Sequence, residues 1–406
     1  MSDGTTNLMT GVKPSAVALA PPEREQTEVF GWQYWTFANA LLRQCAEADE
    51  GKNILLSPLS AAATLSMTAN GAQGDTLSQM RGALGSSLTW NSVKPLDSDG
   101  WNQCFAAYLR SLPDSKKARL SSANAIWLKE GALDVKKDFL QANADYYSAD
   151  VFSARFDEAT KDDINGWVSD RTDGMIPAML DEIPANAVMY LLNALAFDAE
   201  WKEIYRADQV TEGAFTDSDG KTATVPMMIS EEGGYFEDGM ATGFSKPYAD
   251  GYRFVAILPN EGVTVQEYLA SNNAVYQCYL HLKQRQAEDG GDIAIAGLPK
   301  FEANYSAELS GALKAMGMTD AFDTEKADFS GMADAAQGEL YISRVLHKTA
   351  IRVDERGTKA GAATAVEMMT KGALMHSVIL DRPFLYMIVD DEQNLPVFIG
   401  IVNHIE

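Results

Sequence analysis

The sequence predicts a single-domain α+β protein, because helical and strand signals occupy different halves of the chain. Apolar residues recur at helical spacing through much of the first half, whereas short apolar strands dominate from Val188 onward. A length of 406 residues would by itself favour two or three domains, but no linker, repeat or long charge block divides the chain. Hydrophobic residues make up 46% of the chain and can fill one large core. We therefore predict a domain over residues 24–406 that follows a disordered tail at residues 1–23.

The first half carries mostly helix signals. Apolar residues at three- and four-residue steps predict a helix over residues 24–46, and an apolar strand follows at residues 53–57. We expect Ser60 to cap the next helix, which ends at a C-terminal glycine signal, Asn70 and Gly71. The remaining expected elements of this half are helices at 101–112, 135–147 and 162–171 and a strand at 120–128.

The second half carries mostly strand signals. One helix is expected at residues 307–316, ending at Gly317, and a turn-rich segment at 390–396 separates the last two strands. The expected strands lie at residues 190–197, 222–228, 252–258, 292–298, 339–345, 349–354, 384–389 and 397–402.

Composition excludes several classes of function. The net charge of −24 argues against nucleic acid as a partner, because an acidic surface repels phosphates. The three cysteines, Cys45, Cys104 and Cys278, are far apart and predict neither a disulfide framework nor a metal site. No run of about 20 apolar residues is present, so we expect no membrane span. Residues 1–23 lack the basic and then apolar pattern of a signal peptide, so no secretion signal is visible.

We recognise no motif that would carry catalysis or bind a cofactor. The chain has four histidines, and no two of them have the spacing of metal ligands. The nucleophile elbow, the Walker loop and the dinucleotide glycine motif are all absent. We therefore expect no enzyme activity, no cofactor and no metal, and we expect His347 to be a hydrogen-bonded core histidine.

The segment at residues 354–370 is unusual for a strand. Read with a period of two, the charges of Lys359 and Glu367 fall on one face. The other face begins with four small, uncharged residues, namely Thr358, Ala360, Ala362 and Thr364. The segment as a whole contains few of the large β-branched or aromatic residues that normally fill a strand. This pattern indicates a segment that can become a central strand without being committed to one.

A series of short motifs extends along the chain, and in order and separation they resemble the serpin family from about residue 28 to residue 403. Together they make a chance match negligible. The motifs are Asn53–Ser60, Gly71–Thr76, Ile164–Val168, Thr172–Gly174, Leu192–Phe197 with Trp201, Pro299–Phe301, Met316–Phe322, Ala327–Gly331, His347–Ala350, Glu355–Thr358, Arg382–Phe384 and Phe398–Gly400.

The resemblance implies one domain with three β-sheets, eight to nine helices and an exposed reactive-centre loop at about residues 355–380. It implies an irreversible suicide inhibitor of serine proteases, acting as a monomer in a covalent 1:1 complex. The cleaved loop enters the main sheet as an extra strand and traps the acyl-enzyme. The acidic, cysteine-poor chain is also similar to bacterial members of the family, including those of gut commensals, which would place its work outside the cell.

The resemblance assigns roles residue by residue. The hinge comprises Glu355, Gly357, Thr358, Ala360, Ala362, Ala363 and Thr364. The shutter, a polar cluster beneath the opening point of the main sheet, comprises Ser57, Ser60, Asn193 and His347. The breach, where the loop first enters, comprises Trp201, Lys300 and Glu355. An inserting strand needs small, uncharged inward side chains, and the hinge meets that condition.

The bond that a protease would cleave is less well fixed. Counting forward from Glu355 by the family spacing gives Lys371–Gly372, whereas counting back from Pro383 ends on Gly372. Lysine at this point suits a trypsin-like pocket. Cleavage after Thr370 or Met369 would instead suit an elastase-like pocket, and both alternatives stay open.

Three positions depart from the family pattern. Lys359 replaces a usual acidic residue, Gly361 interrupts the alanines, and Asp198–Ala199 replaces a typical lysine and glycine. A non-inhibitory serpin, acting as a binding, carrier or chaperone-like protein, is the main alternative function. Bulky or charged inward hinge residues would favour it, and the sequence has none. A hydrolase with an unrecognised triad is the second alternative.

Overall fold

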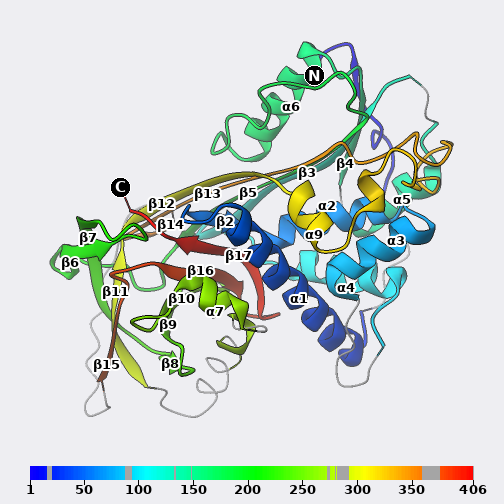
Figure 1. The fold of residues 1–406 in the computed structure, drawn as a ribbon. Coiled ribbons are helices and arrows are strands. Elements are labelled where there is room, and N and C mark those ends of the chain that lie inside the picture. The colour runs from blue at the N-terminus through cyan, green and yellow to red at the C-terminus, as the bar shows by residue number, and fades with distance from the viewer. Residues whose placement is uncertain are drawn as a thin grey trace.

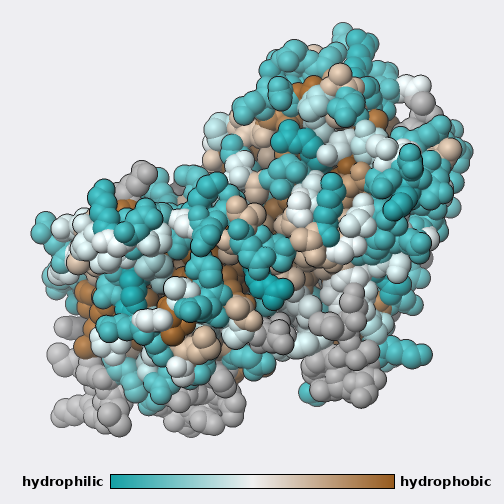
Figure 2. Space-filling view, viewed as in Figure 1, coloured by the Kyte–Doolittle hydropathy of each residue, from teal (hydrophilic) through white to brown (hydrophobic). Residues whose placement is uncertain are grey.

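The computed structural model describes residues 1–15, 21–86, 94–131, 134–147, 149–271, 275–278, 280, 292–358 and 375–405. These residues form three β-sheets of seven, six and four strands, with helices gathered mainly at one end of the molecule (Figure 1). The predicted α+β class, with three sheets and eight to nine helices, is confirmed. The face of the molecule in Figure 2 is mostly hydrophilic, as the net charge of −24 leads one to expect.

The seven-stranded main sheet contains the pieces of chain that matter most for function. Its strand order is β1 (Thr5–Asn7), β4 (Asp150–Ala154), β3 (Ala118–Lys129), β5 (Met189–Glu200), β14 (Gly357–Thr358), β13 (Arg344–Asp354) and β12 (Phe301–Glu308). Strands β5 and β13 run parallel and pair directly from Tyr190 and Arg344 to Ala196 and Ala350. Beyond that point they separate, and the two residues of β14 lie between them, antiparallel to both.

Two smaller sheets complete the β-structure. The six-stranded sheet has the order β2 (Ile54–Leu56), β17 (Leu395–Val402), β16 (Phe384–Asp390), β10 (Tyr252–Pro259), β9 (Ala241–Pro247) and β8 (Phe236–Glu237). The four-stranded sheet has the order β15 (Met375–Ile379), β11 (Ile293–Pro299), β7 (Thr222–Glu232) and β6 (Val210–Thr216). Every residue of β16 and β17 is buried, which explains their continuous apolar sequences.

Helices cover the main sheet on both faces. The helix α6 (Glu158–Arg171) packs Ile164 and Val168 against one face, in a core shared with Trp127 and Leu192. On the opposite side lie α1 (Arg24–Ala48), α2 (Pro58–Ala69), α3 (Gly74–Arg81) and α4 (Ser98–Ser111) (Figure 1). Further helices are α5 (Lys137–Tyr146), α7 (Val265–Ala270), α9 (Ser310–Ala315), the π-helical turn η1 (Gly82–Ser86) and the 3-10 turns η2 (Ala207–Gln209) and η3 (Asp320–Phe322).

The cap of α2 differs from the expectation. Ser57 is the N-cap residue, and its hydroxyl accepts a hydrogen bond from the backbone N–H of Ser60 at 3.1 Å. Pro58 then occupies the first helical position, where its missing N–H costs nothing. Ser60 therefore lies inside the first turn, and its side chain is free to point toward the main sheet.

Two strands also differ from their predicted limits. Of the strand expected at 339–345, only Arg344 and Val345 lie in a strand, and residues 339–343 form a turn and an irregular segment. These two residues begin β13, which continues unbroken through the strand expected at 349–354, because His347 and Lys348 stay in the ladder with β12. The helix expected at 307–316 is shortened to α9, since β12 continues through Glu308. The alternating burial of β12 shows a period of two that the small residues of its sequence obscure.

The first residues of the chain contact the main sheet in the structure, whereas the sequence predicted a disordered tail over residues 1–23. Thr5–Asn7 pair with Phe152–Ala154 as the edge strand β1. The backbone N–H of Ser2 donates to the carboxylate of Asp163 at 2.8 Å. Nothing in the apolar pattern signals this edge strand, because its contacts are made by backbone and polar groups.

Candidate functional site

The segment that leads into β14 is held in place through its own three backbone carbonyls, which accept hydrogen bonds from Trp201 and Tyr205. Trp201 donates its indole Nε1–H to the carbonyl of Asp354 at 2.8 Å and its backbone N–H to the carbonyl of Arg356 at 2.9 Å. Tyr205 donates its backbone N–H to the carbonyl of Glu355 at 2.9 Å. Trp201 is 1% exposed. Residues 354–356 are therefore anchored from one side, and chain movement has to begin after them.

Gly357 is the first residue beyond this anchor. Its φ of 149° lies in a region that residues with a side chain rarely adopt. A Cβ added there would lie 2.0 Å from the carbonyl oxygen of Ala199 on β5. Glycine is thus required both by the backbone angle and by the close approach of β5.

Thr358 already lies inside the main sheet. It pairs with Ala199 of β5 and Val353 of β13, and its side chain is 0% exposed. Its hydroxyl is 2.8 Å from the hydroxyl of Tyr248. Tyr248 stacks on the indole of Trp201 with ring centroids 4.3 Å apart. The sequence placed Thr358 on the inward face but gave no indication of Tyr248, which follows β9.

Lys300 and Glu355, which the family resemblance places in the breach, form an ion pair, with Nζ and Oε2 2.5 Å apart. The hydrogen bond from Lys300 holds the pKa of the Glu355 carboxyl below its ordinary value. The two side chains are 29% and 39% exposed. Water therefore screens the pair, and we assign it a supporting role beside the anchored carbonyls.

A second, more deeply buried ion pair lies beside Trp201, a predicted breach residue. Lys246 Nζ is 2.5 Å from Glu232 Oε1, and the side chains are 3% and 8% exposed. The ammonium also lies 4.3 Å from the ring centroid of Tyr205 and 5.6 Å from that of Trp201. Sequence reasoning missed this pair, because β7 and β9 bring its members together from different sheets.

The predicted shutter residues form one cluster. Asn124 of β3, Asn193 of β5 and His347 of β13 are register partners in a row across the main sheet. Ser60 at the start of α2 donates its hydroxyl to Asn124 Oδ1 at 2.5 Å, and the backbone N–H of Ser57 donates to His347 Nε2 at 3.1 Å. The row thus links three strands to one helix N-terminus, and Asn124 is the member that the sequence analysis did not name.

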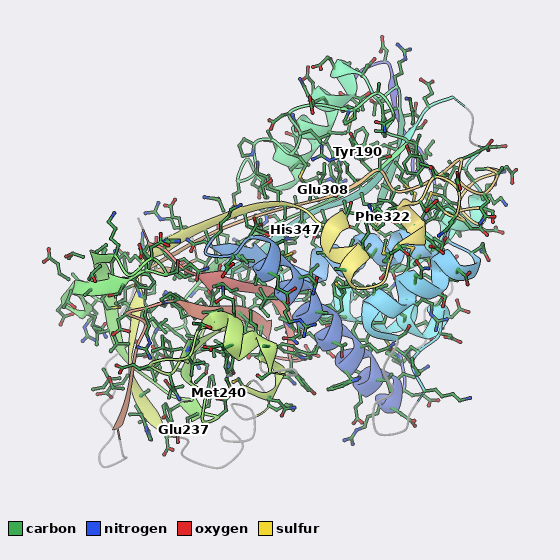
Figure 3. The ribbon with its side chains drawn as sticks, viewed as in Figure 1. Tyr190, Glu237, Met240, Glu308, Phe322 and His347 are labelled. Atoms are coloured by element: carbon green, nitrogen blue, oxygen red, sulfur yellow. The ribbon has the colours of Figure 1, made fainter. Side chains whose placement is uncertain are left out.

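His347 is the centre of this cluster, and its hydrogen bonds fix its tautomer. Figure 3 marks the position of His347 in the molecule. Nε2 accepts a bond from Ser57, so the proton sits on Nδ1, which contacts Asn193 Oδ1. Complete burial lowers the pKa of His347 from 6.5 to about 3. The imidazole is therefore neutral at physiological pH, as expected for a hydrogen-bonded core histidine.

The Nδ2 amide of Asn193 has no hydrogen bond partner within the described part of the chain, although the side chain is fully buried. A buried amide donor without a partner is costly. The cluster thus holds an unused donor at the line where β5 and β13 meet.

Several predicted site residues lie outside the described residues. They are Ala360, Ala362, Ala363 and Thr364 of the hinge and Met369, Thr370, Lys371 and Gly372 around the proposed cleavage point. Their roles stay predictions.

One group of side chains has ligand types that could hold a metal. One atom from each of Asp217, Asp219 and His404 falls within 4.8 Å of the others. These groups already have partners, since Asp217 accepts the backbone N–H of Lys221 at 2.8 Å and His404 Nε2 is 2.6 Å from the carbonyl of Gly51. We assign no ligand to them.

Comparison with known proteins identifies the class to which this architecture belongs. The sequence matches the family model of the serpins (serine protease inhibitors) over residues 33–405. Serpin B10 of Sorex araneus is 31% identical over 389 residues, which cover 90% of this chain and 96% of that protein. The three-sheet fold, with a segment entering between two strands of its largest sheet, is a serpin fold. The chain belongs to the serpin family.

Solved structures agree with this assignment. The thermophilic serpin tengpin in its native state is 42% identical, covers 99% of this chain and 100% of its own, and has a TM-score of 0.88. The latent state of the same protein gives a TM-score of 0.78. Human thyroxine-binding globulin, solved with thyroxine, is 25% identical with a TM-score of 0.81, and it covers 93% of this chain and 99% of its own. The present fold is therefore nearer to the native form of tengpin than to its latent form.

Within the described residues, no helix is both long enough and apolar enough to span a membrane.

Proposed function

We propose that this protein is an irreversible inhibitor of serine proteases that traps the acyl-enzyme by inserting its cleaved loop into the main sheet. The observation that carries the proposal is β14, a two-residue strand already seated between β5 and β13. The sequence that follows Thr358 alternates small, uncharged residues with outward ones. A strand that has begun to enter and can continue is what the mechanism needs.

The register of β14 supports the proposal that the loop can insert further between β5 and β13. Thr358 lies opposite Ala199 and Val353. Six residues further along, an extended antiparallel strand would bring Thr364 between Asn193 and His347, which are themselves register partners. The hydroxyl of Thr364 would arrive at the unused Asn193 donor, and it would replace the contact between Asn193 and His347 that insertion breaks. We therefore expect Thr364 to form hydrogen bonds with Asn193 and His347 once the loop is inserted.

The driving energy would come from exchanging one ladder for two. Insertion replaces the direct parallel pairing of β5 with β13 by two antiparallel ladders, one to each neighbour. Antiparallel pairing is at least as stable per residue, and the inward side chains are buried as well. From Gly357 to Lys371 an extended strand spans roughly 50 Å at about 3.3 Å per residue. That length would carry a bound protease across the domain.

The proposed target is a trypsin-like protease if cleavage follows Lys371 and an elastase-like protease if it follows Thr370 or Met369. We propose that the inhibitor acts as a monomer, forms a covalent 1:1 complex and is not itself an enzyme. We further propose an extracellular site of action. Plasma serine protease inhibitors of Bos taurus and Homo sapiens are among the relatives. A bacterial source stays a prediction.

Mixing the protein with trypsin and with elastase tests the proposal. A band that survives SDS near the summed mass of chain and protease supports inhibition by trapping. Mass spectrometry of the released C-terminal peptide then fixes the cleaved bond. Clean loop cleavage without the band contradicts trapping.

The likeness to thyroxine-binding globulin favours a second candidate, a serpin that binds a small molecule or another partner without trapping proteases. Such a protein would be cleaved as a substrate or ignored by both proteases. The small inward hinge residues favour the inhibitor over this alternative.

A further inference from the structure

Tyr248 occupies a rigid turn between β9 and β10. Its backbone N–H donates to the carbonyl of Tyr252 at 2.9 Å, and Ala249 donates to the carbonyl of Glu200 at 2.8 Å. On the other side, the backbone N–H of Lys202 donates to Pro247 at 3.0 Å. Backbone hydrogen bonds therefore hold the turn internally and also attach it to the end of β5 and the residues that follow.

The ring of Tyr248 is fixed by two aromatic neighbours. It lies nearly parallel to the indole of Trp201, at an interplanar angle of 13°. The ring of Phe197 meets it edge-on, with centroids 5.2 Å apart at 81°. Tyr248 is 2% exposed. With its backbone and its ring both held, the direction of its hydroxyl is set.

That hydroxyl points to Thr358, with the two oxygens 2.8 Å apart, one hydroxyl donating to the other. Among the described residues, each of these two hydroxyls has the other as its one hydrogen bond partner. Burial raises the pKa of Tyr248 well above its ordinary value, so the phenol stays neutral and keeps its proton for this bond. Because both groups are shielded from water, removing either one leaves the other without a partner.

We propose that Tyr248 is a positioning residue for loop insertion, which captures the hydroxyl of Thr358 and so holds the first loop residue in register between β5 and β13. The inference rests on the proposed inhibitory function for its consequence, but the contact itself exists in the uncleaved protein. Without the contact, the first step of insertion loses the bond that defines its starting point.

The two hydroxyls make a double-substitution test possible. Tyr248→Phe keeps the ring and its stacking but leaves Thr358 without a partner. Thr358→Val keeps the size and branching but leaves Tyr248 without one. The double variant removes both hydroxyls, and a pair of apolar groups of the same shape is nearly neutral. If the two hydroxyls are coupled, β14 should be held more firmly in the sheet in the double variant than in either single variant.

The first measurement is hydrogen–deuterium exchange of the uncleaved protein, followed on the peptide that spans residues 354–358. Each single variant should speed exchange of the β14 amides by about 5- to 30-fold, and the double variant should restore most of the protection. Tyr386→Phe is the matched control. Its hydroxyl is equally buried but has no hydrogen bond partner within the described residues. This control should leave β14 unchanged.

The second measurement is the stoichiometry of inhibition with the protease that wild type traps. The stoichiometry of inhibition minus one measures how much inhibitor is lost as cleaved substrate. This quantity should rise by about 5- to 30-fold in each single variant, as for amide exchange, and should return toward the wild-type value in the double variant. Unchanged exchange in Tyr248→Phe overturns the inference, and so does a double variant that is as impaired as the sum of both. If wild type is only cleaved, the inhibitory function fails while the exchange measurement still decides the role of Tyr248.

Discussion

Replacing Thr358 by arginine tests whether the inward face of the hinge controls trapping. In the structure this side chain is fully buried between Ala199 and Val353. A guanidinium there would be a charge without a partner, which costs about 3 to 5 kcal/mol. At about 1.4 kcal/mol for each tenfold change, insertion should slow by about 10²- to 10³-fold or more.

The consequence is a change of outcome after cleavage. Slower insertion allows the acyl-enzyme to hydrolyse first, so Thr358→Arg should be cleaved as a substrate and release active protease. The uncleaved variant should still fold, because the arginine can remain in water with β14 outside the sheet. The assay is a titration of protease with inhibitor, read as residual activity and as the SDS-stable band.

Lys359→Arg is the control, since it places the same side chain on the outward parity of the loop. The extended register would put it between the half-buried Asp198 and the exposed Arg352, clear of the core under α6. Lys359→Arg should trap protease at nearly the wild-type stoichiometry. The parity argument is wrong if Thr358→Arg traps as efficiently as wild type, or if both arginine variants fail equally.

Three further predictions address single residues. His347→Gln keeps an acceptor for Ser57 without a titratable ring. Because the folded pKa of His347 lies near 3, wild type loses stability as pH falls from 6.5 toward 3, by at most about 5 kcal/mol. Urea unfolding at several pH values should show that the variant lacks this part of the acid loss, and parallel curves would contradict it. Glu355→Gln should lower the free energy of unfolding by less than about 1 kcal/mol at neutral pH, because the pair with Lys300 is partly exposed. The effect should vanish in acid, where wild-type Glu355 is protonated too, and a larger loss would show that the pair is not screened. Gly357→Ala should expel β14, since its Cβ would clash with β5, and faster amide exchange at residues 357–358 would show it. Unchanged exchange would mean that β5 moves aside.

Local signals in the sequence account for most of the fold. The apolar runs of β16 and β17 and the helical spacing of α1 predicted these elements close to their observed limits. The strands β1, β4, β6, β8, β9, β12 and β15 were missed, because each is either brief or mixed in polarity. Their pairing in the sheets stabilises them, and no local pattern records that pairing.

The candidate site also contains residues that the sequence predicted and residues that it did not. Sequence motifs brought together Ser57, Ser60, Asn193 and His347, and the period-two pattern placed Thr358 on the inward face. Neither reasoning found Tyr248, whose role depends on a contact between a turn and a hinge that are far apart in the chain.

The order of residues alone sets which side chains are small, charged or apolar, and therefore which face of the predicted hinge can enter a core. Contacts between distant segments set how far this face has entered the main sheet and which side chains it meets there. That depends on where β5 and β13 separate, on the carbonyls anchored by Trp201 and on the buried hydroxyl of Tyr248. These are contacts between distant segments, and their geometry is fixed only when the three sheets pack together.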